Sequence, residues 1–337
     1  MGPLPEFARD PAALLPLYRF MVLARAFDAK AISLQRTGRL GTYPPCLGEE
    51  AVSVGLASAM EPDDVLLPSY RQQPAQLWRG VSPVEILLYW GGDERGSDFA
   101  VPRRDFPICV PVGSQAPHAA GVALAMKLRG ERRIAVCCIG DGGTSKGDFY
   151  EAINLAGVMK LPAVFVVANN QWAISVPRSA QTGASTLAQK AVAAGIPGEQ
   201  VDGNDVIAVG DAVRRATETA RGGGGAALIE ALTYRLGDHT TVDDARRYRD
   251  DAEVTRQWEL EPIARLRKYL TAQGAWGKED EEGLLADCTA QIDAAAETYL
   301  AMEPQPASAM FDHLYAVLPT ELGGQRHQVI AEAGSNA

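Results

Sequence analysis

Between residues 108 and 234, short apolar runs alternate with amphipathic stretches, and this alternation restricts the possible folds more than any other feature of the chain. The runs have the length of buried strands, and the stretches have the apolar spacing of helices. Strands that alternate with helices form a parallel sheet covered on both faces. The pattern therefore predicts an α/β fold with a mostly parallel sheet flanked by helices. We predict strands near 108–112 and at 134–139, 163–168, 206–209 and 227–234, and helices at 117–128, 147–160 and 211–221.

The segments on either side of this core are predicted to be mostly helical. Before it, helices are predicted at 11–37, 48–60 and 83–90, with a short strand within 61–71; after it, helices are predicted at 253–273, 280–302 and 308–317. The glycine run at 222–225 is typical of a turn and not of a domain linker. We therefore expect a single domain over 1–337, with a helical N-terminal part (1–107), a cofactor-binding core (108–250), a helical C-terminal part (251–320) and a flexible tail (321–337).

Composition argues against several classes of protein. The net charge of −10 does not favour nucleic acid as a partner. No apolar run approaches the roughly 18 residues of a membrane span. The N-terminal residues lack the basic and apolar regions of a signal peptide. The five cysteines show no C-x-x-C spacing, which is typical of reduced thiols. We expect a cytoplasmic protein with no membrane partner.

Polar residues follow several of the predicted strands. Asp141, Asn170 and His239 each come after a different strand, and Ser114 and Gln115 come after another. Ligands of open parallel sheets bind at the carboxyl ends of the strands, which lie along one edge. The sequence therefore predicts that these side chains converge on one site.

The G-D-G turn at 140–142 looks like a phosphate-binding loop, but its carboxylate would repel a phosphate. The dinucleotide-binding pattern is not met, because Ser145 stands in place of its third glycine. The P-loop pattern is not met either, because Ser145 precedes Lys146 where a glycine is required. A hard divalent cation between the carboxylate and a phosphate would reverse the unfavourable charge. Mg²⁺ prefers oxygen ligands, so Asp141 and Asn170 are candidate metal ligands. A simple turn or helix N-cap role is the alternative for Asp141.

The residues after Asp141 are suited to an anion. Gly142 and Gly143 have no Cβ, so their backbone can approach a phosphate closely. The N-terminus of the helix predicted at 147–160 adds a favourable dipole. The sequence therefore predicts a metal-dependent phosphate site at this turn.

The order G-D-G, helix, strand and N-N is the fingerprint of thiamine diphosphate-binding proteins. The segment 139–175 resembles the alpha subunit of the decarboxylating component of the 2-oxo acid dehydrogenase complexes. The resemblance covers nearly the whole chain, and the order of its motifs makes it highly specific. Besides 139–175 it includes GRLGTYPPCLGEEA (38–51), LPSYRQQP (67–74), PVGSQAPHAAGVALAMK (111–127), TLAQKAVAAGIPGEQVDGND (186–205) and HTTVDDARRYR (239–249).

This resemblance implies a thiamine diphosphate-binding fold with thiamine diphosphate and Mg²⁺ as cofactors. The implied metal ligands are Asp141, Asn170 and the backbone carbonyl of Trp172, a position where a tyrosine is usual. His239 is the implied catalytic residue, on a mobile loop. Some relatives carry a histidine shortly before Gly48, and this chain has none there. The implied contacts of the cofactor itself are Tyr70, Arg71 (on the phosphate), Val110, Val112, Gly140, Asp141, Gly142, Gly143, Asn170, Trp172 and His239.

The resemblance also implies a reaction and partners. Such chains act in the decarboxylation of a 2-oxo acid and pass the acyl group to a lipoyl arm of the acyltransferase component. A separate beta subunit supplies a glutamate to the cofactor, in an α2β2 heterotetramer. We favour pyruvate as substrate, as in pyruvate dehydrogenase, because residues 186–203 are similar to the bacterial pyruvate type. Residues 245–254 and 261–276 look more like the branched-chain type, which is the alternative. Acetoin cleavage and a non-catalytic cofactor-binding subunit are further alternatives.

Ordinary structural roles compete with these assignments. Arg71 alone would be a solvated surface arginine, His239 a loop histidine, and the charges at 243–249 a solvated run. Within the resemblance we favour functional roles for both residues, and a loop over 236–250 that orders when the cofactor binds. Four tryptophans are expected to pack in the protein rather than in the site: Trp78, Trp90, Trp258 and Trp276.

Overall fold

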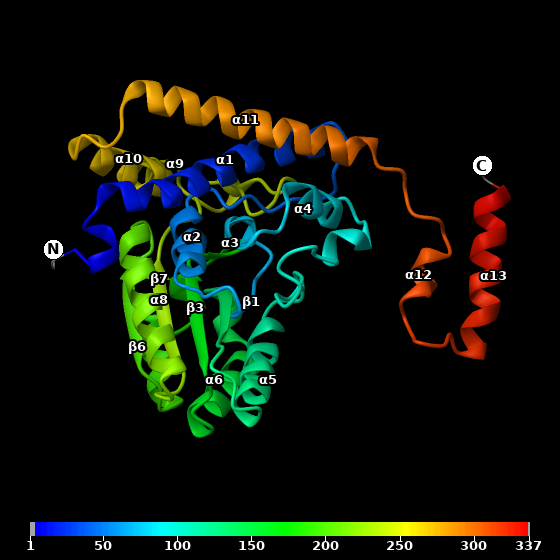
Figure 1. Cartoon of the computed structure of the whole chain (residues 1–337), viewed down its shortest axis with the longest axis horizontal. Helices are drawn as coiled ribbons and strands as arrows, with labels where there is room; N and C mark the ends of the chain where they lie inside the picture. The colour runs from blue at the N-terminus through cyan, green and yellow to red at the C-terminus, as the bar shows by residue number, and fades with distance from the viewer. Residues whose placement is uncertain (1–3, 336–337) are drawn as a thin grey trace.

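The protein is built around one parallel sheet, seen in a computed structural model that describes residues 4–335. Its strands are hydrogen-bonded in the order β1-β2-β3-β7-β6, and every pair is parallel. The predicted α/β fold with a parallel sheet flanked by helices is therefore confirmed (Figure 1). The strands are β1 (Val65–Leu67), β2 (Ala135–Gly140), β3 (Ala163–Asn169), β6 (Gly198–Asp202) and β7 (Ala227–Leu232).

Helices cover both faces of the sheet. One face carries α5 (Gln115–Leu128), α6 (Gly147–Val158) and the short α7 (Lys190–Ala193), and the other carries α2 (Glu50–Ser58) and α8 (Val206–Arg221). Successive strand residues point to opposite faces. Accordingly, Cys137 and Phe165 belong to the first core, whereas Val136 and Val166 belong to the second. Strands β1, β2, β3 and β7 are therefore mostly apolar, because both of their faces are buried.

A third layer joins the two ends of the chain. It packs around α1 (Leu15–Arg36), whose apolar face shares a core with residues of the C-terminal helices (Figure 1). The N-terminal and C-terminal helical segments expected from the sequence thus lie against each other. The other helices of this region are α3 (Gln73–Arg79), α4 (Pro83–Trp90), α9 (Asp251–Trp258), α10 (Pro262–Ala272) and α11 (Lys278–Ala301).

Two of the predicted strands are wrong. Residues 206–209 form the first turn of α8, because the Asp205 side chain accepts hydrogen bonds from the N–H groups of Ile207 and Ala208 and caps the helix. Residues 108–112 have no regular structure. The polar edge strand β6 and the helix α3, which follows the SYR segment, were not predicted.

The predicted C-terminal helices also differ from the structure. The single helix expected at 253–273 is two helices, because Glu261 caps a new helix that begins with Pro262. The helix expected at 308–317 is only α12 (Ala309–Asp312). Within the expected flexible tail, residues up to 335 form α13 (Thr320–Ser335), and 336–337 lie outside the described residues. Helices α12 and α13 stand apart from the layered body (Figure 1).

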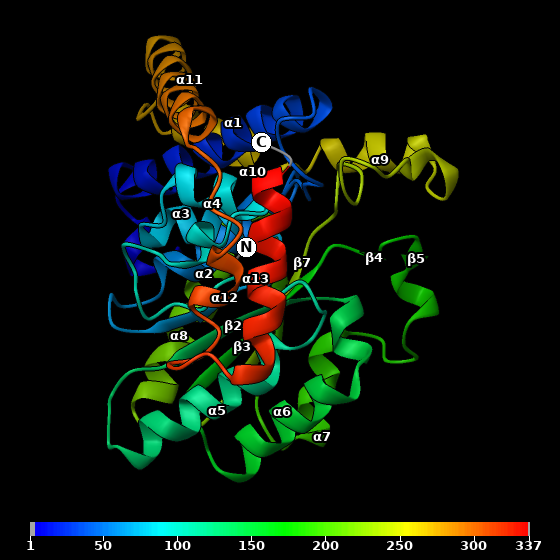
Figure 2. The ribbon, with the colours of Figure 1, turned by 90° about the vertical axis from the view of Figure 1, so that its right-hand side faces the viewer.

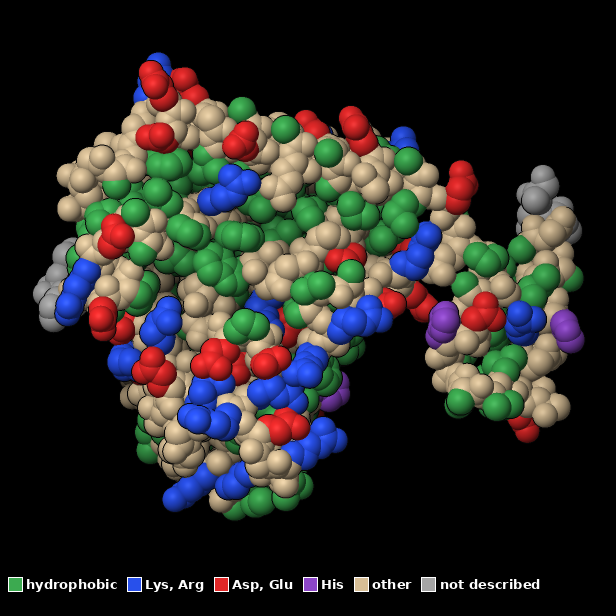
Figure 3. Space-filling model, in the orientation of Figure 1, with side chains coloured by type: hydrophobic (Ala, Val, Ile, Leu, Met, Phe, Trp, Pro, Cys, Tyr) green, Lys and Arg blue, Asp and Glu red, His purple; other side chains and the backbone are tan. Residues whose placement is uncertain are grey.

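A small hairpin extends from the carboxyl end of β3. It consists of β4 (Trp172–Ala173) and β5 (Val176–Pro177), and Figure 2 shows it reaching away from the sheet. Acidic and basic side chains are interspersed on the face seen in Figure 3. Within residues 4–335 no helix has the length and apolarity needed to span a membrane.

Candidate active site

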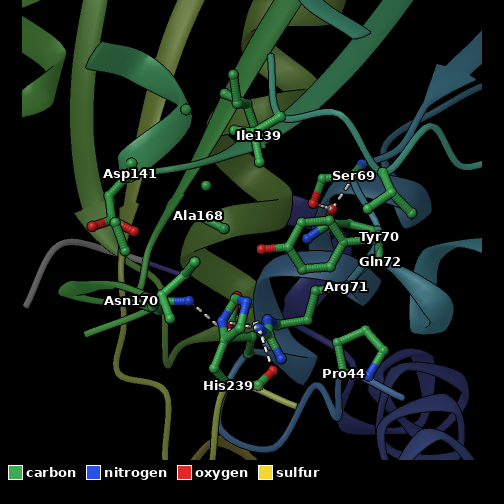
Figure 4. Close-up of a pocket in the computed structure, with 18 of the residues that line it drawn as sticks. Pro44, Ser69, Tyr70, Arg71, Gln72, Ile139, Asp141, Ala168, Asn170 and His239 are labelled. Carbon is green, nitrogen blue, oxygen red and sulfur yellow. Dashed lines mark hydrogen bonds and ion pairs between the residues drawn. The ribbon is translucent and has the colours of Figure 1, made fainter. Parts of the chain in front are cut away.

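A cavity of about 640 Å³ lies at the carboxyl edge of the sheet (Figure 4). Every residue that the sequence analysis assigned to the cofactor or the metal lines it. These are Tyr70, Arg71, Val110, Val112, Gly140, Asp141, Gly142, Gly143, Asn170, Trp172 and His239. The structure therefore brings together residues that are up to 169 positions apart in the sequence (70 to 239).

Four strand ends deliver these side chains. Arg71 follows β1, Asp141 follows β2, Asn170 follows β3, and His239 lies in the loop after β7. The expected convergence is confirmed for Gln115, Asp141, Asn170 and His239 but not for Ser114, and β1 takes the place of the strand predicted near 108–112. Gln115 also lines the cavity, whereas the Ser114 hydroxyl turns away to donate to the carbonyl of Pro111.

Asp141 presents a buried carboxylate to the cavity. Its side chain makes no capping hydrogen bond to the 3-10 turn Gly142–Ser145 that follows it, so the simple N-cap role is not supported. Gln181 Nε2 donates to its Oδ2 at 2.9 Å. Burial raises the pKa of Asp141 above its ordinary value, and the hydrogen bond from Gln181 opposes that rise. Burial destabilises the ionised form of this carboxyl group, and an incoming cation would stabilise it.

The first two positions of the turn after Asp141 leave little room for a side chain. A Cβ on Gly142 would lie 2.5 Å from the Cβ of Ala173, and one on Gly143 would lie 2.6 Å from Cγ1 of Ile139. None of the described groups accepts a hydrogen bond from the N–H of Gly143. A donor without a partner beside the cavity suits an anion such as a phosphate.

The two asparagines after β3 have different partners. Asn169 Nδ2 donates to Glu230 at 2.6 Å inside the sheet, so this residue is structural. Asn170 lines the cavity, where its Nδ2 donates to Glu49 Oε1 at 2.7 Å. Its Oδ1 accepts from the N–H of Trp172 at 3.1 Å and keeps one lone pair. Only the second asparagine is therefore placed to bind a metal.

Trp172 lines the cavity, and its side chain is held by aromatic neighbours. The indole Nε1 donates to the Tyr234 hydroxyl at 3.3 Å, and the ring packs against Tyr248. The preceding Gln171 has φ of 72°, an unusual conformation for a residue with a side chain. The Trp172 carbonyl, the expected third ligand, lies 3.5 Å from Arg235 Nη1.

These groups fit a hard cation bridged to a phosphate. Residues 4–335 contain no cluster of three or more His, Cys, Asp or Glu side chains that could hold a metal. The donor set here is one carboxylate, one amide oxygen and one carbonyl, which leaves coordination positions for phosphate oxygens and water. Such an incomplete set is what Mg²⁺ uses beside a phosphate.

Arg71 is buried, with 4% of its surface exposed, so it is not a solvated surface arginine. Its Nε lies 3.4 Å from Glu49 Oε1, and its guanidinium also donates to the carbonyls of Pro45 and His239. The guanidinium lies 5.6 Å from the centre of the Tyr70 ring. In Figure 4 the Tyr70 and Arg71 side chains lie across the cavity from Asp141.

His239 lies between two guanidinium groups. Its Nδ1 is 3.2 Å from Arg71 Nη2 and 3.3 Å from Arg235 Nη1. A guanidinium can only donate, so Nδ1 is the acceptor and the proton of the neutral ring is on Nε2. Burial, followed by the charges of Arg71 and Arg235, lowers the pKa of His239 to about 4, although Asp243 opposes this. The imidazole is therefore a neutral Nε2–H donor at pH 7.

The loop that carries His239 is held by its own side chains. Tyr248 donates to Asp243, and Asp243 accepts from the N–H of His239 at 2.8 Å. Arg235 Nη2 donates to the Tyr248 hydroxyl at 2.9 Å, and Arg249 donates to the carbonyls of Arg235 and Gly237. The charges at 243–249 are thus partly used inside the loop and are not simply solvated.

A family model described as "Dehydrogenase E1 component" matches residues 18–307. The chain belongs to the dehydrogenase E1 component family. It is 42% identical to the 3-methyl-2-oxobutanoate dehydrogenase subunit alpha of Mycobacterium tuberculosis, over 94% of this chain and 86% of that protein. It is also 42% identical to the pyruvate dehydrogenase E1 component subunit alpha of Staphylococcus aureus, over 93% and 85% respectively.

Three residues of this E1 component site were missed in the sequence analysis. Glu49 lines the cavity and contacts both Asn170 and Arg71; its place in the LGEEA segment was the only signal. Trp90 packs against the core and the rings of Tyr43 and Tyr89, as expected, and it also lines the cavity. Arg235 contacts Nδ1 of His239 through Nη1. Its position directly after a predicted apolar strand was the available signal in the sequence.

The pKa of His239 predicts an unusual titration. The unfolded chain takes up a proton on this ring below about pH 6.5, whereas the folded chain does so only near 4. Between these values the unfolded state binds more protons, so the stability that the neutral ring provides is present above pH 6.5 and is lost as the pH falls towards 4. We expect an NMR titration of the four histidine rings to give a midpoint near 4 for the resonance that His239→Asn removes. A midpoint near 6.5 would contradict the placement between two guanidinium groups.

Proposed function

We propose that this chain is the alpha subunit of an E1 component that uses thiamine diphosphate and Mg²⁺ to decarboxylate a small 2-oxo acid. The observation that carries the proposal is the convergence of Asp141, Asn170, Arg71 and His239 on one cavity at the carboxyl edge of the sheet. A non-catalytic subunit would have no need for a buried neutral histidine beside the metal and phosphate positions.

In this proposal each part of the cavity binds a different part of the cofactor. Asp141, Asn170 and the carbonyl of Trp172 hold Mg²⁺, and Arg71 holds a phosphate. The N–H of Gly143 adds a donor to the diphosphate. When bound, thiamine diphosphate supplies an electron sink for the loss of CO₂ from the substrate. The remaining cofactor contacts are assigned to Tyr70, Val110, Val112, Gly140 and Gly142.

We assign the catalytic role to His239. Its Nδ1 is fixed by Arg71 and Arg235, so its Nε2–H is the group available to the substrate or to the lipoyl arm of the acyltransferase component. A proton held on Nε2 can stabilise a developing oxyanion or be donated during acyl transfer. Burial and the neighbouring guanidinium groups keep the ring neutral and therefore keep Nδ1 free of a proton.

The rim of the cavity supports a beta subunit as partner. Val110 and Val112 are 51% and 43% exposed, and Ile174 and Val176 of the neighbouring hairpin are 56% and 44% exposed. Apolar side chains gathered at the mouth of a site mark a contact surface. A beta subunit on this rim, in an α2β2 heterotetramer, would exclude water and bring the glutamate that the cofactor needs.

Pyruvate is the substrate we propose, and 3-methyl-2-oxobutanoate is the second candidate. The second is favoured by a specific observation, because a relative named for that substrate is as similar to the chain as the pyruvate dehydrogenase subunit, each at 42% identity. The test is turnover of pyruvate, branched-chain 2-oxo acids and acetoin by the complex reconstituted with beta subunit and acyltransferase. If the reconstituted complex turned over none of these compounds, the proposed reaction would be refuted. The cytoplasmic location stays a prediction.

The loop over 236–250 is expected to gain protection when the cofactor binds. The His239 carbonyl accepts from Arg71 Nη2 at 3.0 Å, so an anion on Arg71 is coupled directly to the loop. Hydrogen exchange with and without thiamine diphosphate and Mg²⁺ should show slower exchange in this segment only when both are present. Equal protection in the two states would mean that the loop is static.

A further inference from the structure

Glu49 and Glu50 are neighbours that serve different parts of the molecule. Glu50 accepts from Arg25 Nη2 at 2.6 Å and from the N–H of Gly48 at 2.9 Å, so it ties α1 to the start of α2. Glu49 is 1% exposed and lines the cavity. A substitution of Glu49 therefore changes the site, whereas a substitution of Glu50 changes a contact between α1 and α2.

The amide of Asn170 is fixed from two opposite sides. The ionised form of Glu49, which Arg71 favours, can only accept, and its Oε1 accepts from Nδ2 at 2.7 Å. The N–H of Trp172 can only donate, and it donates to Oδ1 at 3.1 Å. An asparagine amide is nearly symmetrical in shape, so its neighbours decide which end faces a given point. Together these two contacts leave the oxygen, and not the NH₂ group, free to act as a ligand.

We propose that Glu49 is a positioning residue for the metal, acting through Asn170: it binds the amide nitrogen and so presents the amide oxygen to a divalent cation. This inference rests on the proposed function. Without this acceptor, only the N–H of Trp172 still orients the amide, and rotations that offer the NH₂ group to the cation become less costly. Partners that orient metal ligands are typically worth about 10- to 100-fold in metal affinity.

Glu49 has a second contact, which allows the effect of its substitution to be distinguished from a general distortion of the cavity. The same Oε1 lies 3.4 Å from Arg71 Nε, so the carboxylate partly neutralises the arginine assigned to the phosphate. Removing Glu49 should reduce the gain in anion affinity that Mg²⁺ provides. It also removes the negative charge that partly offsets the charge of Arg71. A damaged cavity would instead bind the anion less well both with and without the metal.

The test is calorimetric titration of inorganic diphosphate into the full chain co-expressed with its beta subunit, in EDTA and in Mg²⁺. For the unchanged protein we expect Mg²⁺ to raise the affinity. In Glu49→Leu this gain should fall by about tenfold or more, while the affinity in EDTA is equal or higher. Glu49→Gln should recover most of the gain, because its Oε1 can still accept from Asn170. Glu50→Gln should lower the melting temperature and keep the gain.

A double-mutant cycle separates action through Asn170 from a direct effect. In the Asn170→Ala background, Glu49→Leu should cause no further loss of the Mg²⁺ gain. Glu49→Ala replaces the leucine variant if that variant does not fold. A full Mg²⁺ gain in the folded Glu49 variant, or an additive cycle, would overturn the inference. If the unchanged protein shows no Mg²⁺-dependent binding at all, the proposed function fails instead.

Discussion

Asp141→Ala is expected to abolish Mg²⁺-dependent binding of thiamine diphosphate while the fold stays intact. Asp141 is the only carboxylate of the proposed metal ligands, so its loss should exceed the roughly 10- to 100-fold cost of removing an outer partner. The fold should tolerate the change, because burial raises the pKa of Asp141 and its charge is therefore unfavourable in the folded protein. Calorimetry with and without Mg²⁺, together with thermal unfolding, measures both effects.

Two further variants calibrate this result. Asn170→Ala should weaken binding less, because water can replace a neutral ligand. Asp148→Ala is the matched control, because Asp148 is an exposed aspartate in the first turn of α6 that pairs with Lys146 at 3.2 Å and does not line the cavity. Undiminished cofactor affinity in Asp141→Ala would refute the metal assignment.

The isolated chain is expected to have essentially no decarboxylase activity. Thiamine catalysis needs a glutamate against the aminopyrimidine ring of the cofactor. Among the described residues the cavity is lined by a single glutamate, Glu49, and this carboxylate is held by Asn170 and Arg71 at the metal and phosphate end. The exposed apolar rim around Val110 and Ile174 is where a second subunit would bring the missing group.

Co-expression with a beta subunit should therefore restore activity and change the mass in solution. We expect an α2β2 heterotetramer that turns over a 2-oxo acid with an artificial electron acceptor, and an alpha chain that alone does not. Full activity of the isolated chain would mean that a glutamate of this chain serves the cofactor, and the assignment of a beta subunit would be wrong.

The sequence predicted the parallel sheet and the polar residues that follow its strands, because both depend on local patterns. Apolar strands followed by Asp141 and Asn170 indicate which residues lie at the carboxyl edge, and parallel topology brings them together. The errors arose where local patterns compete. Residues 206–209 have the composition of a strand, but the Asp205 cap starts a helix there. The strand β6 is polar because it lies at the edge of the sheet.

The supporting contacts of the site could not be predicted from the sequence. Glu49 meets Asn170 across 121 positions, and only the folded chain shows which of two adjacent glutamates faces the cavity. The neutral state of His239 depends on burial and on Arg71 and Arg235, and the contact with Arg71 spans 168 positions. Such long-range contacts between polar side chains leave no periodic signal.

The central claim is that this cavity is a metal-dependent thiamine diphosphate site. Calorimetric titration of thiamine diphosphate into the wild-type alpha and beta chains, with Mg²⁺ and then with EDTA, tests it most directly. The account predicts saturable binding of one cofactor per alpha chain that requires Mg²⁺. Absence of binding, or binding of the same affinity in EDTA, would contradict it.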